Sequence, residues 1–303
     1  MPDKNRFDDL VNNDNITTQN STNVDLSEKE SVMRETYTED EIRDVNNITV
    51  TIPDPDTPIV VLFGAPSSGK TMALLRMIRF FDKKSYSIEP VAVFRPKSDK
   101  HYEKMCAGLK TMAYSKYSPG ATDIISFMLV KIYNQGRPIC QILEAPGEHY
   151  FDGSNNSSFP TYIQTLMGTV NRKIWIFFVQ KDWGADANER ELYKQAIHNV
   201  RIGERDEVVF LFNQADRFLH LYINGHPNKE AFSREINQQY TNIFQPYQNT
   251  GIKKTLYGRD NFKTVCFSSG SFTLTSEKKE VWIPGDDDWY CQALWNALNL
   301  PNK

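Results

Sequence analysis

The stretch that most constrains this chain is Val60–Leu75, which reads VVLFGAPSSGKTMALL. In it an apolar run passes through a glycine-containing turn into a helix-like segment, which is the pattern of a phosphate-binding loop. The glycines let backbone N–H groups approach phosphate oxygens, and the helix N-terminus adds its positive end. A chance match is expected in roughly one chain of this length in a hundred. We predict a nucleoside triphosphate site formed by Gly64, Ala65, Pro66, Ser67, Ser68, Gly69, Lys70 and Thr71.

Two side chains of this loop suit a magnesium-bound triphosphate. Lys70 would place its ammonium on the β- and γ-phosphates, where it would also serve catalysis, and Thr71 would bind Mg²⁺ through its hydroxyl. Many enzymes share the loop, so it does not distinguish a kinase, an ATPase or a GTPase. That distinction depends on residues further along the chain.

Composition excludes several other classes of protein. The chain has 303 residues, of which 40% are hydrophobic, and its net charge of -3 argues against nucleic acid as the main partner. No run of 18 apolar residues could span a membrane, and the N-terminus lacks the apolar core of a secretory signal. The four cysteines form no CxxC pair, so we expect neither a disulfide scaffold nor a zinc site. These features predict a cytoplasmic protein.

The chain divides into a polar segment and a folded body. Residues 1–46 are rich in Asn, Asp, Glu, Ser and Thr, so they bury too little apolar surface to offset the entropy of ordering, and we expect a disordered tail. From residue 47 to 303, strand-like and helix-like segments alternate, which predicts one α/β domain.

The apolar runs predict six strands, at 59–63, 123–133, 138–145, 173–180, 207–213 and 263–269. Helical patterns begin at Lys70 and cover 162–170, 188–200, 228–244 and 288–298. The turn sequence NQGR between the second and third strands predicts an antiparallel hairpin, whereas the other strands are separated by helices. The expected fold is therefore a three-layer P-loop NTPase fold, with a mostly parallel six-stranded sheet that includes one antiparallel hairpin strand.

The sequence after the third strand is LEAPGEHYFD. Here the chain resembles P-loop GTPases of the Ras-like and translation-factor group, in which a DxxG motif ends that strand. The resemblance implies that Glu144 replaces the Asp that holds Mg²⁺ through water, and that the N–H of Gly147 senses the γ-phosphate. Glu is one methylene longer than Asp, so the metal geometry would have to adjust. The alternative interpretation is an ordinary Pro-Gly turn.

The fifth strand ends in FLFNQADRF, which is similar to the NKxD motif of the same family. The resemblance assigns Asn213, Gln214 and Asp216 to the base, with Gln214 in place of the usual Lys. A carboxylate at Asp216 would accept from guanine N1–H and the exocyclic amine, two donors that adenine does not present together. The alternative is a polar loop after a buried strand. The sixth strand ends at Ser268 and Ser269, which the resemblance places against guanine O6 through backbone N–H groups.

The hydrolytic residues are the least typical part of the resemblance. The family's switch threonine corresponds to Thr122, a predicted Mg²⁺ ligand. The residue that orients water usually follows the DxxG glycine, and here Glu148 and His149 are the candidates. Pro119 stands where some switch proteins carry an arginine. We therefore expect slow hydrolysis, or hydrolysis that depends on a partner. The alternative is that Glu148 and His149 are surface residues.

The segment at about 85–120 is a long insert before Thr122, with five lysines and interleaved tyrosines. Such a segment can bind an acidic partner, although a solvated insert is the commoner meaning. Together the motifs, over roughly 47–300, resemble a divergent P-loop GTPase that binds GTP or GDP with Mg²⁺ and acts as a switch. A protein partner would bind through the switch regions or the insert. Two alternatives remain: a nucleotide-binding scaffold without hydrolysis, or an ATP-using P-loop NTPase.

Overall fold

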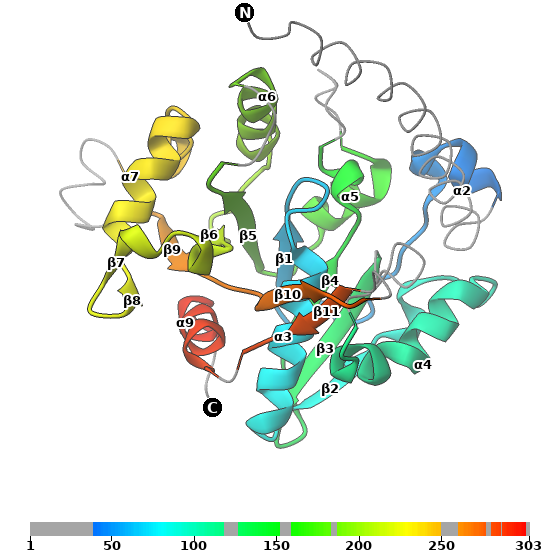
Figure 1. The fold of residues 1–303 in the computed structure, drawn as a ribbon. Coiled ribbons are helices and arrows are strands. Elements are labelled where there is room, and N and C mark those ends of the chain that lie inside the picture. Colours follow the sequence, from blue (N-terminus) through cyan, green and yellow to red (C-terminus); the bar gives the residue numbers. More distant parts are fainter. Residues whose placement is uncertain are drawn as a thin grey trace, which may run out of the picture.

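The computed structural model describes residues 39–117, 127–151, 159–182, 187–249, 260–276, 280–285 and 287–300. A seven-stranded sheet forms its centre, with the order β2-β3-β4-β1-β5-β6-β9 (Figure 1). The strands are β1 (Ile59–Phe63), β2 (Ser87–Pro90), β3 (Met128–Asn134), β4 (Arg137–Glu144), β5 (Lys173–Gln180), β6 (Glu207–Asn213) and β9 (Phe262–Cys266).

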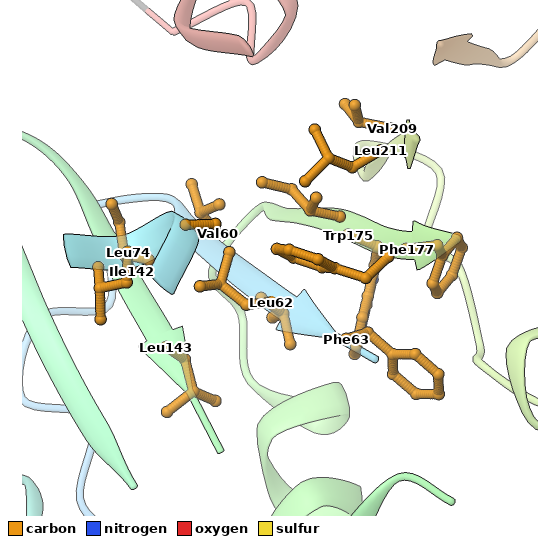
Figure 2. Packing of buried hydrophobic residues seen from close by; sticks show 14 of the residues in the cluster. Val60, Leu62, Phe63, Leu74, Ile142, Leu143, Trp175, Phe177, Val209 and Leu211 are labelled. Atoms are coloured by element: carbon orange, nitrogen blue, oxygen red, sulfur yellow. The ribbon is translucent and has the colours of Figure 1, made fainter. Parts of the chain in front are cut away.

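The direction of the strands follows the sequence pattern. The pairs β4–β1, β1–β5, β5–β6 and β6–β9 are parallel, and β3 is antiparallel to both of its neighbours, β2 and β4. The central strand β1 is buried along its whole length, as a parallel strand covered on both faces must be. Figure 2 shows Phe63 beside Trp175 and Phe177, and the rings of Phe63 and Phe177 lie 5.3 Å apart.

Helices cover the two faces of this sheet (Figure 1). The longer ones are α3 (Lys70–Lys83), α4 (Lys100–Tyr114), α5 (Thr161–Gly168), α6 (Ala187–His198), α7 (Lys229–Gln239) and α9 (Trp289–Ala297). Phe81 of α3 packs edge-on against Trp295 of α9, with their ring centroids 4.8 Å apart. Among the described residues, no helix combines the length and apolar character needed to cross a membrane.

The expected three-layer α/β fold is confirmed, with seven strands in the sheet rather than six. The additional strand, β2, lies at the edge, and Ile88 is its one buried residue, so no continuous apolar run marks it. It belongs to the insert, whose described residues 85–117 also form a 3₁₀ turn (Ala92–Phe94) and α4. Near the C-terminus a separate hairpin pairs β10 (Ser271–Leu274) with β11 (Glu280–Ile283). A short pair, β7 (Tyr222–Ile223) and β8 (His226–Pro227), follows β6.

The end of the segment expected to be a polar tail packs on the insert. Residues Glu39–Arg43 form α2, and the buried side chain of Glu41 accepts a hydrogen bond of 2.7 Å from Arg95. The same guanidinium binds Asp99 at 2.8 Å, and all three side chains are nearly inaccessible to solvent. A polar hollow beside them is lined by residues of α2, of the segment that follows it and of the insert, and none of these residues belongs to the phosphate loop. The ordered body therefore extends upstream of residue 47, at least to Glu41.

A stability measurement tests this buried ion triad. Arg95→Met leaves two buried carboxylates without their cation, and it is expected to lower the free energy of unfolding by about 3–5 kcal/mol. The matched control is Lys100→Met, which breaks the exposed pair with Glu103 and is expected to cost less than about 1 kcal/mol. Urea denaturation measures both values, and equal effects of the two substitutions would contradict the burial of the triad.

Candidate functional site

The phosphate loop connects the buried end of β1 to the first residue of α3. Its backbone takes positive φ at Ser67 (57°) and Gly69 (85°), and the second of these favours glycine. A Cβ on Gly69 would also lie 2.4 Å from Nδ2 of Asn213. The loop is thus wound tightly at the carboxyl edge of the sheet, where α/β proteins bind their ligands.

Lys70 is buried inside this loop and is 5% exposed. Its Nζ donates to the carbonyl oxygens of Gly64 at 3.0 Å and Ala65 at 3.1 Å. Burial lowers the pKa of Lys70, while the carboxylates of Glu144 and Glu148 act in the opposite direction. An ammonium has three donors, so the two carbonyl bonds leave one donor for an anionic ligand.

Glu144 lies at the end of β4 beside the first turn of α3. Its Oε1 accepts a hydrogen bond of 3.1 Å from the hydroxyl of Thr71. Its Oε2 is buried, and no described residue forms a hydrogen bond with it. Burial raises the pKa of Glu144 to about 8, against the effect of the Lys70 charge. An orphaned carboxylate oxygen next to a hydroxyl fits a hard cation such as Mg²⁺, whose ligands are oxygens.

The described ranges contain no group of three or more His, Cys, Asp or Glu side chains placed to hold a metal. A Mg²⁺ ion at Thr71 and Glu144 would therefore need further oxygen ligands from phosphate or water, as is usual for this ion. The third predicted ligand, Thr122, lies outside the described residues, which resume at Phe127.

Gly147 lies directly against the phosphate loop. A Cβ at this position would be 2.2 Å from the backbone nitrogen of Pro66 and 2.4 Å from the carbonyl carbon of Ala65. Only glycine allows two backbones to approach this closely. The predicted γ-phosphate-sensing turn and the phosphate loop are therefore in contact.

The two candidates for orienting water lie in different environments. Glu148 is exposed to solvent, whereas His149 is buried and 8% exposed. The imidazole Nδ1 lies 2.5 Å from the hydroxyl of Tyr162, and the ring packs edge-on against Phe127. Burial, reinforced by the positive charge of Lys70, lowers the pKa of His149 to about 4. At neutral pH this side chain is an uncharged part of the interior.

The predicted base-binding turn is joined to the phosphate loop by Asn213. This side chain is 2% exposed, and its Nδ2 donates to the carbonyl oxygen of Ser68 at 2.8 Å. After it, Gln214 takes a left-handed conformation (φ 54°), and the N–H of Ala215 donates to Phe267 O at 3.0 Å. Asp216 follows in a 3₁₀ turn and is half-buried. The structure therefore brings Asn213, the first residue of the predicted base-binding turn, into contact with the phosphate loop.

Buried polar atoms without a hydrogen-bond partner in the described structure gather around Gly69. They include Oγ of Ser68, Oδ1 of Asn213 and Oγ of Ser269. Such atoms are costly in a folded protein unless a ligand or water satisfies them. Ser268 uses its own hydroxyl to accept from the N–H of Gly270 at 3.1 Å.

Three residues at this site were not found from the sequence. Gln180, at the end of β5, donates from Nε2 to Oε1 of Gln214 at 2.9 Å, and Arg217 donates to the same oxygen at 2.6 Å. Arg76, on α3, donates to the carbonyl oxygens of Ser268 and Asp287, and so holds the loop that contains Ser268, Ser269 and Gly270, here called the serine loop. The one signal for Arg76 was an arginine on the apolar face of a helix.

Comparison with known proteins gives matches by structure alone. No family model and no curated protein matches the chain. Among solved structures it is similar to putative nucleolar GTP-binding protein 1 of Plasmodium falciparum, with 14% identity over 73% of this chain and 81% of that one, at a TM-score of 0.35. It is also similar to the signal recognition particle receptor SRb-GTP/SRX complex of Chaetomium thermophilum, with 10% identity over 78% of this chain and 96% of that one, at a TM-score of 0.36.

A third similar structure is Roco2 RocCORdC of Methanosarcina barkeri bound to GDP, with 10% identity over 83% of this chain and 52% of that one, at a TM-score of 0.33. These three structures are described as GTP-binding or GDP-bound proteins.

The buried imidazole of His149 gives the protein a specific pH dependence. Its pKa falls from 6.5 to about 4 on folding, so its contribution to stability is complete above pH 6.5 and is lost as the pH falls toward 4. Between pH 7 and pH 4, the wild type should lose about 3 kcal/mol more free energy of unfolding than His149→Gln. The control His220→Gln, which changes an exposed ring, should follow the wild type. Parallel curves for wild type and His149→Gln would contradict the buried neutral imidazole.

Proposed function

We propose that this chain binds a guanine nucleotide with Mg²⁺ and acts as a slow or partner-stimulated GTPase switch. The observation that carries the proposal is the bond from Asn213 Nδ2 to the carbonyl oxygen of Ser68, at 2.8 Å. This bond joins the turn that resembles a guanine-recognition motif to the loop that resembles a phosphate grip. A nucleotide lying along this edge would meet both.

The phosphates would lie at the N-terminus of α3. Backbone N–H groups there, together with the remaining donor of Lys70, supply the charge and hydrogen bonds that phosphate oxygens require. Thr71 and Glu144 would hold Mg²⁺, and Thr122 would complete the set on the family pattern. When bound, Mg²⁺ neutralises charge on the phosphate oxygens.

The base would lie between the turn that contains Asp216 and the serine loop. The Asp216 carboxylate can accept from two guanine donors at once, N1–H and the exocyclic amine. Gln214 has its amide oxygen held by Gln180 and Arg217, so its side chain has a defined direction beside the base position. Backbone N–H groups at Ser268 and Ser269 would meet guanine O6.

Hydrolysis would be slow because the parts that accelerate it are altered. The buried His149 is bonded to Tyr162, so orienting water would fall to the exposed Glu148, whose charge opposes an approach to the γ-phosphate. A partner that binds the switch regions or the insert could supply the missing positive charge. The alternatives remain a scaffold that binds nucleotide without hydrolysis and an ATP-using enzyme.

Replacing one atom of Asp216 tests the choice of base. Asp216→Asn turns one acceptor into a donor, so guanine loses a partner while xanthine, which has a carbonyl in place of the amine, gains one. The variant should bind GDP at least about tenfold more weakly than wild type and should prefer XDP. Fluorescent-nucleotide titration with GDP, XDP and ADP measures this preference. Equal GDP and ADP affinities in wild type, unchanged in the variant, would refute guanine recognition.

Phosphate release under multiple turnover tests the switch. The rate is expected to be on the order of 10⁻³ s⁻¹ or slower without a partner. Glu148→Ala should reduce it further, whereas Glu204→Ala, which changes another exposed glutamate, should not. A brisk rate that survives simultaneous replacement of Glu148 and His149 would overturn the assignment of roles, and complete absence of turnover with tight binding would favour the scaffold.

A further inference from the structure

The serine loop is followed by the β10–β11 hairpin, and the hairpin packs on the loop. Trp282 of β11 is 2% exposed, and its indole Nε1 donates to the carbonyl oxygen of Ser269 at 2.8 Å. Gly270 has a φ of 110°, and a Cβ there would lie 2.3 Å from Ile283 O. The backbone of the serine loop therefore packs directly against β11.

The same indole also contacts helix α3. The guanidinium of Arg79 lies 4.4 Å from the centre of the Trp282 ring, which is a cation–π contact. Arg79 donates to the carbonyl oxygen of Ser115 at 2.9 Å and to that of Ala113. Because α3 begins at the phosphate loop, one helix connects the phosphate grip to both the indole and the end of α4.

The backbone of Trp282 reaches the insert directly. Its N–H donates to the carbonyl oxygen of Lys116 at 2.9 Å, and Val281 forms a β-bridge with Tyr117. Lys116 and Tyr117 are the last described residues before the segment that contains Thr122. Trp282 thus contacts the serine loop through its side chain, and through its backbone it contacts Lys116, which precedes the predicted switch segment.

We propose that Trp282 is a positioning residue for base recognition, which also ties the base side of the site to the segment leading to Thr122. The inference rests on the proposed guanine site. The bond to Ser269 O fixes the peptide whose neighbours would meet the base, and an indole has few rotatable bonds with which to relax. Loss of the indole N–H leaves that carbonyl oxygen buried without its donor, and the loop must shift to recover a partner.

Calorimetric titration of the full chain with GDP and with pyrophosphate tests this role, because pyrophosphate carries the phosphates without the base. Trp282→Phe keeps an aromatic ring but removes the donor, and it should weaken GDP binding about tenfold while leaving pyrophosphate binding unchanged. The control Trp295→Phe changes a buried tryptophan that packs on Phe81 and Tyr86, and it should leave the ratio of the two affinities at the wild-type value.

A second measurement, limited proteolysis with trypsin, tests the connection between Trp282 and the insert. In wild type, GDP should protect the bond after Lys116 from trypsin more than pyrophosphate does, and in Trp282→Phe this difference should disappear. Arg79→Lys keeps the charge but removes the guanidinium that lies over the indole, so it should also reduce this difference between GDP and pyrophosphate.

Two results would overturn the inference. Both leave the GDP-to-pyrophosphate affinity ratio of Trp282→Phe at the wild-type value: in one neither ligand is weakened, and in the other both are weakened equally. If wild type prefers GDP to ADP while Trp282→Phe keeps its ratio, the positioning role alone fails. If wild type shows no preference for GDP over ADP, the guanine site fails and the role of Trp282 fails with it.

Discussion

The burial of one ammonium group governs the arrangement of this site. Lys70 has its charge inside the phosphate loop, bonded to two carbonyl oxygens and opposite the buried Glu144. A buried cation is costly unless anionic groups surround it, and Glu144 itself has an oxygen that no described residue satisfies. A phosphate with its metal ion would satisfy both residues at once. We therefore propose that the loop binds a ligand that carries negative charge and brings a cation.

The turns that contact the phosphate loop bear on which group the proposed ligand carries besides its phosphates. Gly147 allows the turn after β4 to touch the loop backbone, and Asn213 bonds the turn after β6 to the same loop. Two turns that are distant in sequence therefore contact the same phosphate loop, and the second turn contains Asp216. The β10–β11 hairpin holds the serine loop, because the indole of Trp282 donates a hydrogen bond to the carbonyl oxygen of Ser269. In the proposed function, base recognition therefore depends also on the β10–β11 hairpin, which contributes no side chain to the motifs that resemble those for guanine.

The parts predictable from the sequence were those that local pattern determines. Continuous apolar runs marked the six longer strands of the sheet, and the motifs placed Lys70 and Asn213 on one edge. The contribution of Glu41 was hidden, because its partner Arg95 lies 54 positions away in the chain. The strands β2, β10 and β11 are only four residues long, and only Ile88 and Trp282 are buried in them, so the sequence did not mark them as strands. Whether His149 faces solvent or Tyr162 depends on tertiary packing that spacing does not encode.

A crystal structure of the full chain with GDP and Mg²⁺ would test the central claim most directly. We predict the β-phosphate on the N-terminus of α3 beside Lys70, and the guanine with N1 and its exocyclic nitrogen within about 3.2 Å of the Asp216 carboxylate. A base that lies away from Asp216, or a diphosphate bound elsewhere than at Gly64–Thr71, would contradict it.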